Sequence, residues 1–321
     1  MRLTDKVLDI VQYARDEGDA AAEAEYNIAH ETLRRYKRAA QTDKADLPDF
    51  DKPTEKTLRE IAERYSAEEL KAIAKGGLAP PKNNTIDASW FDGETITFGV
   101  ITDTHIGSKD FREDWFNAAV DRFAYHSVDF IAHVGDVTEG MSGRPGHVYE
   151  LDHIGYTQQK KAAIPFMEML VDIAPTYAIA GNHDLWHMKS NGGDIVEDIC
   201  GETGVTFLGH HFGDINIGGI KIGLHHGEDG SSYSYSYRVQ KIIESMAGGS
   251  KPNILLTGHV HKSYYFFDRN IHAIGAGCIQ AQTRWMRAKR LPAHPGFWVV
   301  EVDINNGSVV RFNPHFYAFY K

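Results

Sequence analysis

Five short segments of this sequence carry side chains that can bind a metal ion. They are DTH at 103–105, GD at 135–136, GNHD at 181–184, HHG at 225–227 and GHVH at 258–261. Their donors are carboxylate, amide and imidazole groups without a thiolate, a set that suits Mn²⁺, Fe or Zn²⁺ rather than Ca²⁺. The sequence therefore predicts a transition-metal site to which all five segments contribute.

Each of these segments directly follows an apolar run, such as residues 95–101 before the first and 254–257 before the last. Apolar and β-branched runs of this length predict buried strands. In α/β proteins, ligand sites form at the carboxyl ends of strands. One DxH pair alone would more often be a hydrogen-bonded pair in a loop, but five such endings in one order are a specific signal.

The order DxH, GD, GNHD, HHG and GHxH resembles that of the calcineurin-like metallophosphoesterase superfamily over about residues 95–321. The resemblance implies that one metal ion is held by Asp103, His105, Asp136 and His261. A second ion would be held by Asp136, Asn182, His226 and His259. Asp136 would thus bridge the two ions, and His226 is preferred to His225 because it directly precedes the glycine.

The same resemblance implies a dinuclear-metal-dependent phosphodiesterase. Two cations about 3.5–4 Å apart lower the pKa of a bridging water, and the resulting hydroxide attacks the phosphorus in line. Mn²⁺ is the expected ion, with Fe, Zn²⁺ or Ni²⁺ as alternatives. His183 resembles the non-ligand histidine of the family, a general acid whose help is typically worth about 10²–10⁴-fold. Glu139 stands where protein-phosphatase members carry an aspartate that orients this histidine, so we expect it to orient His183.

The apolar runs alternate with amphipathic segments in a way that predicts an α/β fold. Helices are expected at 115–126, 158–173, 195–201 and 239–246. Strand–helix alternation up to Ala180 predicts parallel crossover units, whereas glycine and Asn-Asn-Gly turns at 205–224 and 264–316 favour antiparallel hairpins. The expected architecture is two mixed β-sheets packed as a sandwich and flanked by helices, which is also the fold that the resemblance implies.

The N-terminal residues 1–41 predict a small all-α domain that resembles a helix-turn-helix. A helix at 4–18 precedes two short helical patterns that meet near Asn27, a residue that tolerates the left-handed conformation of a tight turn. The last helix would present four cations to DNA phosphates, namely Arg34, Arg35, Lys37 and Arg38. Alternatively, these cations form a solvated face of a packing or oligomerisation module.

Composition shifts divide the rest of the chain. Residues 42–53 and 76–94 are polar and broken by proline or glycine, which predicts linkers, and a helical segment is expected between them at 54–75. The catalytic domain is expected to span 95–321.

The overall composition predicts a soluble cytoplasmic protein. The 321 residues include only two cysteines, and we find no apolar run that approaches the ~18 residues of a membrane span. The net charge of −10 argues against a surface that coats nucleic acid generally, so contacts with polyphosphate must be local or made through metal ions.

Three segments combine aromatic and basic residues beside the predicted site. These are the insertion at 141–156 with Arg144, His147 and His153, the alternating tyrosines Tyr233, Tyr235 and Tyr237, and the basic stretch at 280–290 with Trp285. Such interleaving is typical of single-stranded nucleic-acid sites, where stacking contributes about 1–3 kcal/mol per base. Alternatively, the tyrosines form a half-buried strand, Trp285 anchors the core and the histidines are hydrogen-bonded loop residues. The 280–290 stretch resembles DNA-nuclease-like and phage-type members of the superfamily.

The sequence thus favours a nuclease acting on DNA, with a homo-oligomer left open. A nucleotide or small-molecule phosphodiesterase or phosphatase is the first alternative. A protein phosphatase is disfavoured because that branch shows GDxVDRG and GNHE where this chain has GDVTEG and GNHD. A non-catalytic DNA-binding or assembly factor is the remaining alternative.

Overall fold

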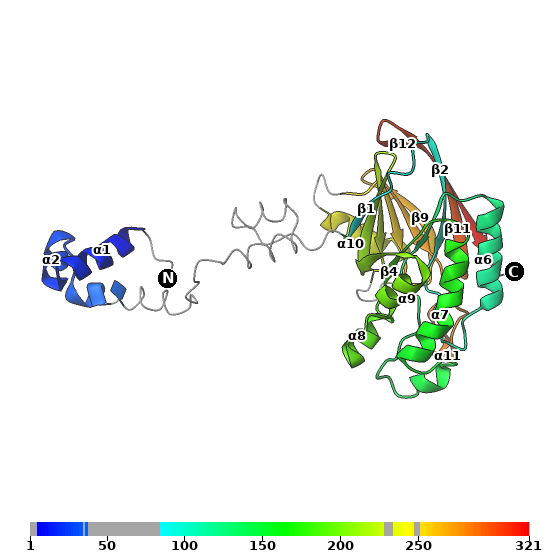
Figure 1. Ribbon diagram of the computed structural model, residues 1–321, viewed down its shortest axis with the longest axis horizontal. Helices are drawn as coiled ribbons and strands as arrows, with labels where there is room; N and C mark the ends of the chain where they lie inside the picture. The colour runs from blue at the N-terminus through cyan, green and yellow to red at the C-terminus, as the bar shows by residue number, and fades with distance from the viewer. Residues whose placement is uncertain (1–4, 35, 38–83, 228–233, 247–250, 321) are drawn as a thin grey trace. The chain divides into compact units, whose positions relative to one another are not determined.

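The computed structural model describes residues 5–34, 36–37, 84–227, 234–246 and 251–320 (Figure 1). The chain divides into two compact units, Met1–Pro81 and Lys82–Lys321. Within the described parts of the chain, no helix has the length and apolar character needed to cross a membrane.

The larger unit is built on two six-stranded sheets. In the first sheet the strand order is β12-β11-β2-β3-β4-β5, and in the second it is β1-β6-β7-β8-β10-β9. The strands are β1 (Thr85–Asp87), β2 (Thr95–Ile101), β3 (Phe130–His133), β4 (Thr176–Ala180), β5 (Thr206–His210), β6 (Phe212–Ile217), β7 (Ile220–His225), β8 (Ile254–Thr257), β9 (Ser263–Asp268), β10 (Ile271–Ala276), β11 (Gly296–Asn305) and β12 (Ser308–Ala318). Both sheets are mixed.

The predicted pairing pattern is confirmed except at β5, which lies in the stretch expected to form hairpins but pairs in parallel with β4. Strands β2, β3, β4 and β5 pair in parallel, whereas β6–β7, β9–β10 and β11–β12 form antiparallel hairpins. The helices that connect or follow the parallel strands are α6 (Glu113–Tyr125), α7 (Tyr156–Val171), α8 (Leu185–Asn191) and α9 (Ile195–Thr203).

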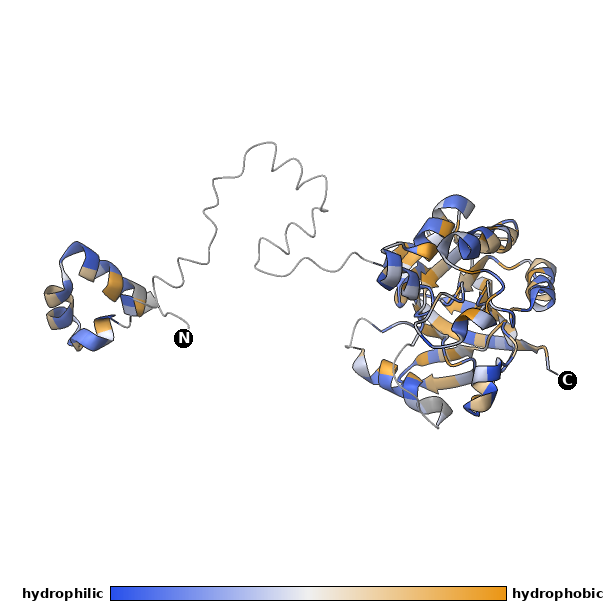
Figure 2. Ribbon diagram, turned by 90° about the horizontal axis from the view of Figure 1, so that it is seen from below, coloured by the Kyte–Doolittle hydropathy of each residue, from blue (hydrophilic) through white to orange (hydrophobic). Residues whose placement is uncertain are grey.

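The two sheets pack face to face, with helices on the outside. Alternate residues of β2, such as Phe98 and Val100, join a core that also contains Ile222 of β7 and Leu256 of β8. Ile101 of β2 and Ile131 of β3 belong instead to a second core, which they share with residues of α6, α7 and α9. Side chains alternate between the faces of a strand, so strands buried on both faces must be apolar throughout. In Figure 2 the hydrophobic colour accordingly concentrates on the strands. The expected sandwich flanked by helices is confirmed.

Helix α10 (Tyr235–Ser245) covers the outer face of the second sheet. Val239 and Ile243, four residues apart, are fully buried against Leu255 of β8 and Ala273 of β10. The alternative that the alternating tyrosines form a strand is therefore wrong for Tyr235 and Tyr237, because the buried positions that follow recur with a helical period. Tyr233 lies outside the described residues.

The expected linker at 76–94 needs correction. Thr85–Asp87 form the edge strand β1, which pairs in parallel with β6, and the compact unit begins at Lys82. A three-residue strand is too short to show a period in the sequence, so composition alone misassigned it. The expected segments 42–53 and 54–75 lie outside the described residues.

The smaller unit contains α1 (Asp5–Asp16), α2 (Asp19–Glu25) and further helical residues at 30–34 and 36–37. Its core contains Ile10 and Ala14 of α1, Ala22 of α2 and Leu33. Between the second and third helical segments, Asn27 has φ 48°, the left-handed conformation expected from the sequence. Its assignment as a helix-turn-helix remains a prediction.

Candidate metal centre

The seven predicted ligands converge at the carboxyl ends of strands from both sheets. Asp103 and His105 follow β2, Asp136 follows β3 and Asn182 follows β4, all in the first sheet. In the second sheet, His226 follows β7 and the pair His259 and His261 follows β8. The parallel order of these strands explains the convergence, because their carboxyl ends meet at one edge.

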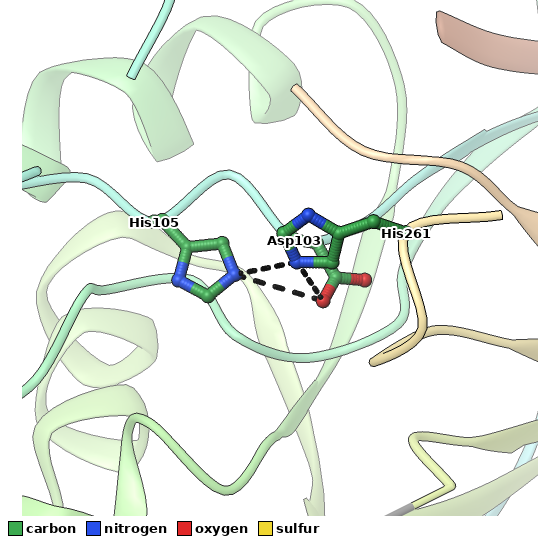
Figure 3. Close-up of side chains that lie close together, drawn as sticks. All are labelled: Asp103, His105 and His261. Carbon is green, nitrogen blue, oxygen red and sulfur yellow. Dashed lines mark hydrogen bonds and ion pairs between the residues drawn. The ribbon is translucent and has the colours of Figure 1, made fainter. Parts of the chain in front are cut away.

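One group of donors consists of Asp103, His105 and His261 (Figure 3). The Nε2 atoms of the two histidines lie 3.0 Å apart, and Asp103 Oδ1 lies 3.1 Å from His261 Nε2 and 3.7 Å from His105 Nε2. All three side chains are buried. Two ring nitrogens and a carboxylate oxygen that point at one another present lone pairs to a common point, which is the arrangement that a cation requires.

A second group consists of Asp136, His226 and His259, joined by Asn182. Asn182 Oδ1 lies 3.1 Å from His226 Nε2 and 2.7 Å from His259 Nδ1. His226 Nδ1 donates to the backbone carbonyl of Val134 at 2.8 Å, which leaves Nε2 facing the group. The neighbouring His225 ends β7 and pairs in register with Thr257.

Asp136 lies between the two groups. Its Oδ2 is 3.1 Å from His226 Nε2 and 3.8 Å from His105 Nε2, while its Oδ1 accepts a hydrogen bond from the backbone N–H of His183. Burial alone would raise the pKa of Asp136, but the charges of His226 and His183 hold it well below its usual range. Conversely, burial lowers the pKa of His226, while the Asp136 and Asp103 carboxylates raise it overall to about 9.

Five of the seven predicted ligands have a backbone conformation that is rare outside glycine. The φ angles of Asp103, His105, Asp136, His259 and His261 lie between 49° and 67°. Each such conformation costs about 1–3 kcal/mol and persists where the surroundings enforce it, commonly at functional sites. The concentration of this strain on the predicted ligands supports a functional role for the cluster.

The glycines that precede the donors leave room for them. A Cβ on Gly181 would lie 2.2 Å from Asp136 Oδ1 and 2.6 Å from His226 Nε2, and one on Gly258 would lie 2.9 Å from Asp103 Oδ2. The strand, glycine, donor pattern in the sequence thus has a steric cause, since the ligands pack directly on the glycine backbone.

Asp184, the last residue of the GNHD segment, was missed as a site residue. Its buried carboxylate accepts hydrogen bonds from the backbone N–H groups of Val137, Thr138 and Gly181 at 2.8–3.1 Å. Burial and the nearby Asp136 raise its pKa to about 7, although these hydrogen bonds favour the charged form. Asp184 therefore ties the loop after β3 to the loop after β4, on which two of the donors lie.

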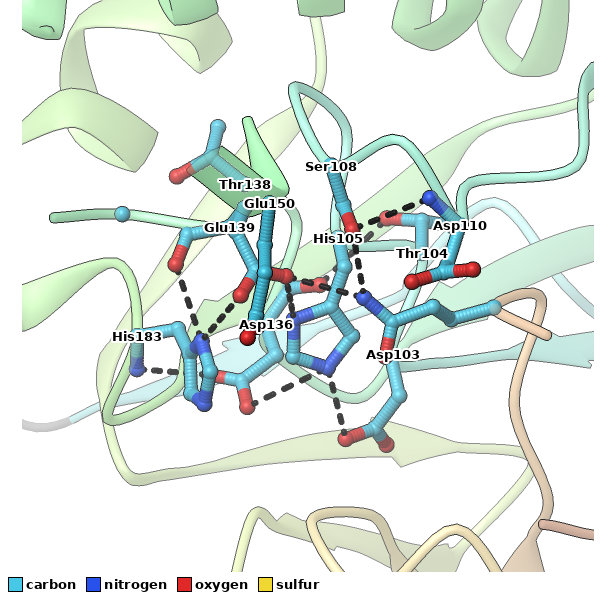
Figure 4. A network of polar contacts seen from close by, with 12 residues as sticks. Asp103, Thr104, His105, Ser108, Asp110, Asp136, Thr138, Glu139, Glu150 and His183 are labelled. Atoms are coloured by element: carbon cyan, nitrogen blue, oxygen red, sulfur yellow. Dashed lines mark hydrogen bonds and ion pairs between the residues drawn. The ribbon is translucent and has the colours of Figure 1, made fainter. Parts of the chain in front are cut away.

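Glu139 lies beside both His105 and His183 (Figure 4). Its Oε2 lies 3.0 Å from His105 Nδ1, and its carboxylate also contacts His147 Nε2 and Gln280 Nε2 at 2.9 Å each. His183 Nδ1 instead donates to the backbone carbonyl of Glu139 at 2.8 Å, whereas Glu139 Oε1 is 3.7 Å away. The carboxylate therefore lies nearest His105, whereas the hydrogen bond to His183 is made by the backbone carbonyl of Glu139.

His183 lies beside Asp136 with its ring on Trp186. The two ring centroids are 4.0 Å apart, and His105 meets the His183 ring edge-on at 4.5 Å. Burial and the nearby His105 lower the pKa of His183. Because Nδ1 bonds the backbone, Nε2 is the atom that remains for other contacts. Trp186, three residues beyond His183, was not identified from the sequence, since nothing in its spacing sets it apart from a core residue.

A cavity of about 480 Å³ opens onto both donor groups. Its lining includes Arg144 and Trp285, which were proposed from the sequence, and Arg238 and Lys262, which were not. His147 is buried against Glu139 and Trp186 rather than lining the cavity.

Of the four predicted DNA-binding cations, the structure describes two. Arg34 is exposed, whereas Lys37 is half-buried and forms an ion pair with Asp19 of α2. Arg35 and Arg38 lie outside the described residues. Nothing in these contacts distinguishes a DNA-binding face from a solvated one.

The donor chemistry fits divalent transition metals. Imidazole, carboxylate and amide oxygen are their usual ligands, and the Glu139 contact with His105 is the carboxylate–histidine pair that commonly orients a metal ligand. Within each donor group, the ligand atoms of the Asp and His residues all lie within 4.8 Å of one another.

Comparison with known families agrees with this geometry. The family described as "Calcineurin-like phosphoesterase superfamily domain" matches residues 96–303. Among solved structures, a novel archaeal phosphodiesterase is similar, with a TM-score of 0.40 and 16% identity over 69% of this chain and 100% of its own. A phosphoesterase from E. coli has a TM-score of 0.38 and 13% identity over 68% and 98% of the two chains.

The curated relatives include proteins named DNA polymerase II small subunit. That of Halobacterium salinarum is 22% identical over 237 residues, which cover 60% of this chain and 46% of the relative. That of Methanocaldococcus jannaschii is 22% identical over 268 residues, covering 70% and 44%. The chain therefore spans about half the length of the curated relatives it matches. The family match covers more than half of this sequence and includes all seven predicted ligands, and on that basis the chain belongs to the calcineurin-like phosphoesterase superfamily.

Proposed function

We propose that this chain is a dinuclear-metal-dependent phosphodiesterase that cleaves DNA. The observation that carries the proposal is the convergence of seven donor side chains on two adjoining groups with Asp136 between them. In each group, histidine and carboxylate atoms with lone pairs face one another. A purely structural cluster would not need this arrangement, because a buried hydrogen-bond acceptor is normally paired with a hydrogen-bond donor.

In this proposal, one ion would be held by Asp103, His105 and His261 and the other by Asn182, His226 and His259, and Asp136 would serve both. Two divalent cations, most readily Mn²⁺, would supply charge neutralisation and an ionised water for in-line attack on phosphorus. Glu139 acts as a positioning residue, since its carboxylate fixes the His105 ring with Nε2 toward the site.

His183 is proposed as the general acid. A bond forms between the water oxygen and phosphorus, the bond from phosphorus to the leaving alkoxide breaks, and a proton passes from His183 Nε2 to that alkoxide. The hydrogen bond from Nδ1 to the Glu139 carbonyl orients the ring for this transfer. The negative charge of a bound phosphodiester would favour the imidazolium, opposing the lowered pKa of His183 in the free protein.

DNA is the favoured substrate for two reasons. Tryptophan and arginine side chains line the cavity, which suits bases and phosphates. The curated relatives are also named as subunits of a DNA polymerase. The N-terminal unit, whose sequence includes Arg34, Arg35, Lys37 and Arg38, is proposed to add affinity for DNA and to be a separate domain.

The names of these relatives favour one further candidate, a non-catalytic subunit that assembles with DNA-replication proteins. In that case the chain would bind a protein or DNA partner without turnover. The presence of His183 beside all seven donors favours catalysis, because assembly does not require a general acid.

The test is hydrolysis by the purified chain with Mn²⁺. Bis(p-nitrophenyl) phosphate, a cyclic nucleotide, and labelled single- and double-stranded DNA would be assayed side by side. We expect turnover of the nitrophenyl diester and of DNA, lost in Asp136→Ala and retained in Lys241→Gln, an exposed change on α10. Hydrolysis of the cyclic nucleotide in preference to DNA would identify a nucleotide phosphodiesterase. Absence of any turnover would favour the assembly factor.

A further inference from the structure

We propose that His147 and Gln280 are positioning residues for the metal centre. Together they hold the Glu139 carboxylate beside the ligand His105, and neither is among the seven proposed ligands. The inference rests on the proposed function, because it assigns these two side chains a part in binding the metal ions. It is carried by the hydrogen bonds that converge on one buried carboxylate.

The contacts of His147 determine which of its ring nitrogens carries the proton. The backbone N–H of Ser142 donates to His147 Nδ1 at 3.1 Å, so this nitrogen is a hydrogen-bond acceptor. The ring proton is then on Nε2, which donates to Glu139 Oε1 at 2.9 Å. One side of the imidazole therefore holds the loop at 142–150, and the other side holds the carboxylate.

Gln280 supplies the second hydrogen bond to Glu139. Its side-chain nitrogen lies 2.9 Å from Glu139 Oε2, the same oxygen that lies 3.0 Å from His105 Nδ1. A carboxylate accepts hydrogen bonds and donates none, so the amide must turn its N–H groups toward it. The same nitrogen also donates to Ser108 Oγ at 3.1 Å, in the loop that follows β2. Both oxygens of the carboxylate thus have a donor that opposes its rotation away from His105.

Burial makes these hydrogen bonds costly to lose. The side chains of Glu139, His147, Gln280 and His105 belong to residues that are between 1% and 5% exposed. A buried charged group that loses a hydrogen-bond donor keeps the cost of its removal from water without the compensating bond. We therefore expect the carboxylate to turn toward another donor when either partner is removed, which would release the His105 ring.

The two hydrogen bonds come from segments that line the cavity, the loop at 142–150 and the stretch that leads into α11 (Arg284–Ala288). Arg144 of the loop binds Glu150 at 2.7 and 3.1 Å, and its guanidinium carbon lies 5.4 Å from the ring centre of Trp285 in α11. The segments thus contact each other at the cavity, and both also reach the carboxylate. A change that displaces either segment should therefore weaken metal binding.

Two substitutions of His147 separate its two hydrogen bonds. Glutamine places its amide near the position of Nε2 and can still donate to Glu139, whereas asparagine places its amide near Nδ1 and can bond only the loop. In the full-length chain, we expect Mn²⁺ affinity measured by calorimetry to fall about tenfold in His147→Asn and to stay within about threefold of wild type in His147→Gln. His153→Gln, at an exposed histidine of the same insertion, is the control and should leave the affinity unchanged.

Gln280→Met tests the second hydrogen bond. Methionine has nearly the same length but no N–H group, so Mn²⁺ affinity should again fall about tenfold. The matched control is Gln282→Met, since the Gln282 amide donates to the carbonyl of Leu291 rather than to Glu139. This control should keep the wild-type affinity.

A further readout needs neither metal nor turnover. Nitrogen–proton correlation spectra of the imidazole rings in metal-free protein should show His147 with its proton on Nε2, in a signal that is absent from His147→Asn. A proton on Nδ1 instead, or equal Mn²⁺ affinities in His147→Asn and His147→Gln, would overturn the positioning role while hydrolysis by the wild type still supported the phosphodiesterase. Wild-type protein that binds Mn²⁺ but hydrolyses no diester would refute the proposed function, and the affinities of the variants would still decide the positioning role.

Discussion

At the scale of single residues, the site is organised by side chains that fix one another. His105 is oriented by Glu139, His226 by the Val134 carbonyl and His183 by the Glu139 carbonyl. In each imidazole, Nδ1 lies within 3.0 Å of a protein oxygen, which leaves Nε2 for a metal ion or a substrate. Roles within the site can be separated by removing one partner at a time.

His183→Gln tests the proposed acid. We expect kcat for DNA to fall by about 10²–10⁴-fold, the usual contribution of general acid catalysis. Metal content, measured by inductively coupled plasma mass spectrometry, should stay at the wild-type value because His183 is not a proposed ligand. A substrate with a p-nitrophenolate leaving group needs less protonation and should lose less activity. Loss of metal in this variant would instead make His183 a ligand.

Glu139→Gln tests the positioning of His105. An amide holds the His105 ring less strongly than a carboxylate, so metal affinity should fall by about 10–100-fold, the usual effect of removing such a partner. Titration with Mn²⁺ followed by calorimetry would measure it. Glu168→Gln, on the exposed side of α7, is the matched control and should leave the affinity unchanged. Unchanged affinity in both variants would assign Glu139 a packing role only.

At the scale of elements, strand ends and tight loops position the donors. The strands contribute parallel alignment, and the loops contribute left-handed turns at Asp103, His105, Asp136, His259 and His261. Asp184 and the glycines before the donors then pack two of these loops against each other. The loops therefore tolerate few substitutions even where no ligand is changed.

Two glycine-to-alanine substitutions distinguish a glycine that the donor side chains pack against from a glycine in an open position of a helix. A methyl group on Gly181 would lie 2.2 Å from Asp136 Oδ1, so Gly181→Ala should lose bound metal and turnover. Gly201 lies within α9 with nothing within 4 Å of an added Cβ, so Gly201→Ala should raise the free energy of unfolding by about 0.5–1 kcal/mol. Chemical denaturation and metal analysis of both variants would measure these effects. A Gly181→Ala variant with full metal content would contradict the proposed packing.

The sequence predicted those elements whose apolar residues recur at a regular spacing, or whose end is marked by a glycine and a metal-binding side chain. Strand β2, with Ile96, Phe98 and Val100 on one face, and helix α9 follow directly from their patterns. Strand β1 and helix α11 are too short to show a regular spacing of apolar residues. The start of α10 was not predicted, because its tyrosines alternate with serines as residues of a strand would.

The donors could be placed from the sequence because each follows a strand, but contacts between loops could not. The reach of Glu139 to His105, the hydrogen bonds of Asp184 and the approach of Trp186 to His183 depend on how loops far apart in the chain pack together. Arg238 was missed for the same reason, since it faces the cavity only because α10 lies on the second sheet.

At the scale of the whole molecule, the chain combines two compact units with different expected tasks. The larger unit contains every donor and the cavity, and the smaller contains Arg34 and Lys37. The net charge of −10 makes general attraction to DNA unfavourable, so binding must depend on local basic groups.

Paired substitution of Arg34 and Arg35 tests the smaller unit. If these cations bind phosphates, changing both to Ala should lower DNA affinity and reduce the slope of log K against log salt by about 0.9 for each phosphate that is no longer neutralised. Hydrolysis of bis(p-nitrophenyl) phosphate should be unaffected, since all seven proposed donors belong to the larger unit. An unchanged salt slope would favour the packing or oligomerisation role.

The most direct measurement is the number of Mn²⁺ ions bound per chain, determined together with diester hydrolysis for wild-type protein and Asp136→Ala. Asp136 contacts both donor groups, so the account predicts two ions and turnover in the wild type, and the loss of turnover with fewer than one tightly bound ion in the variant. Wild-type protein that binds no stoichiometric metal, or a variant that keeps two ions and normal turnover, would contradict it.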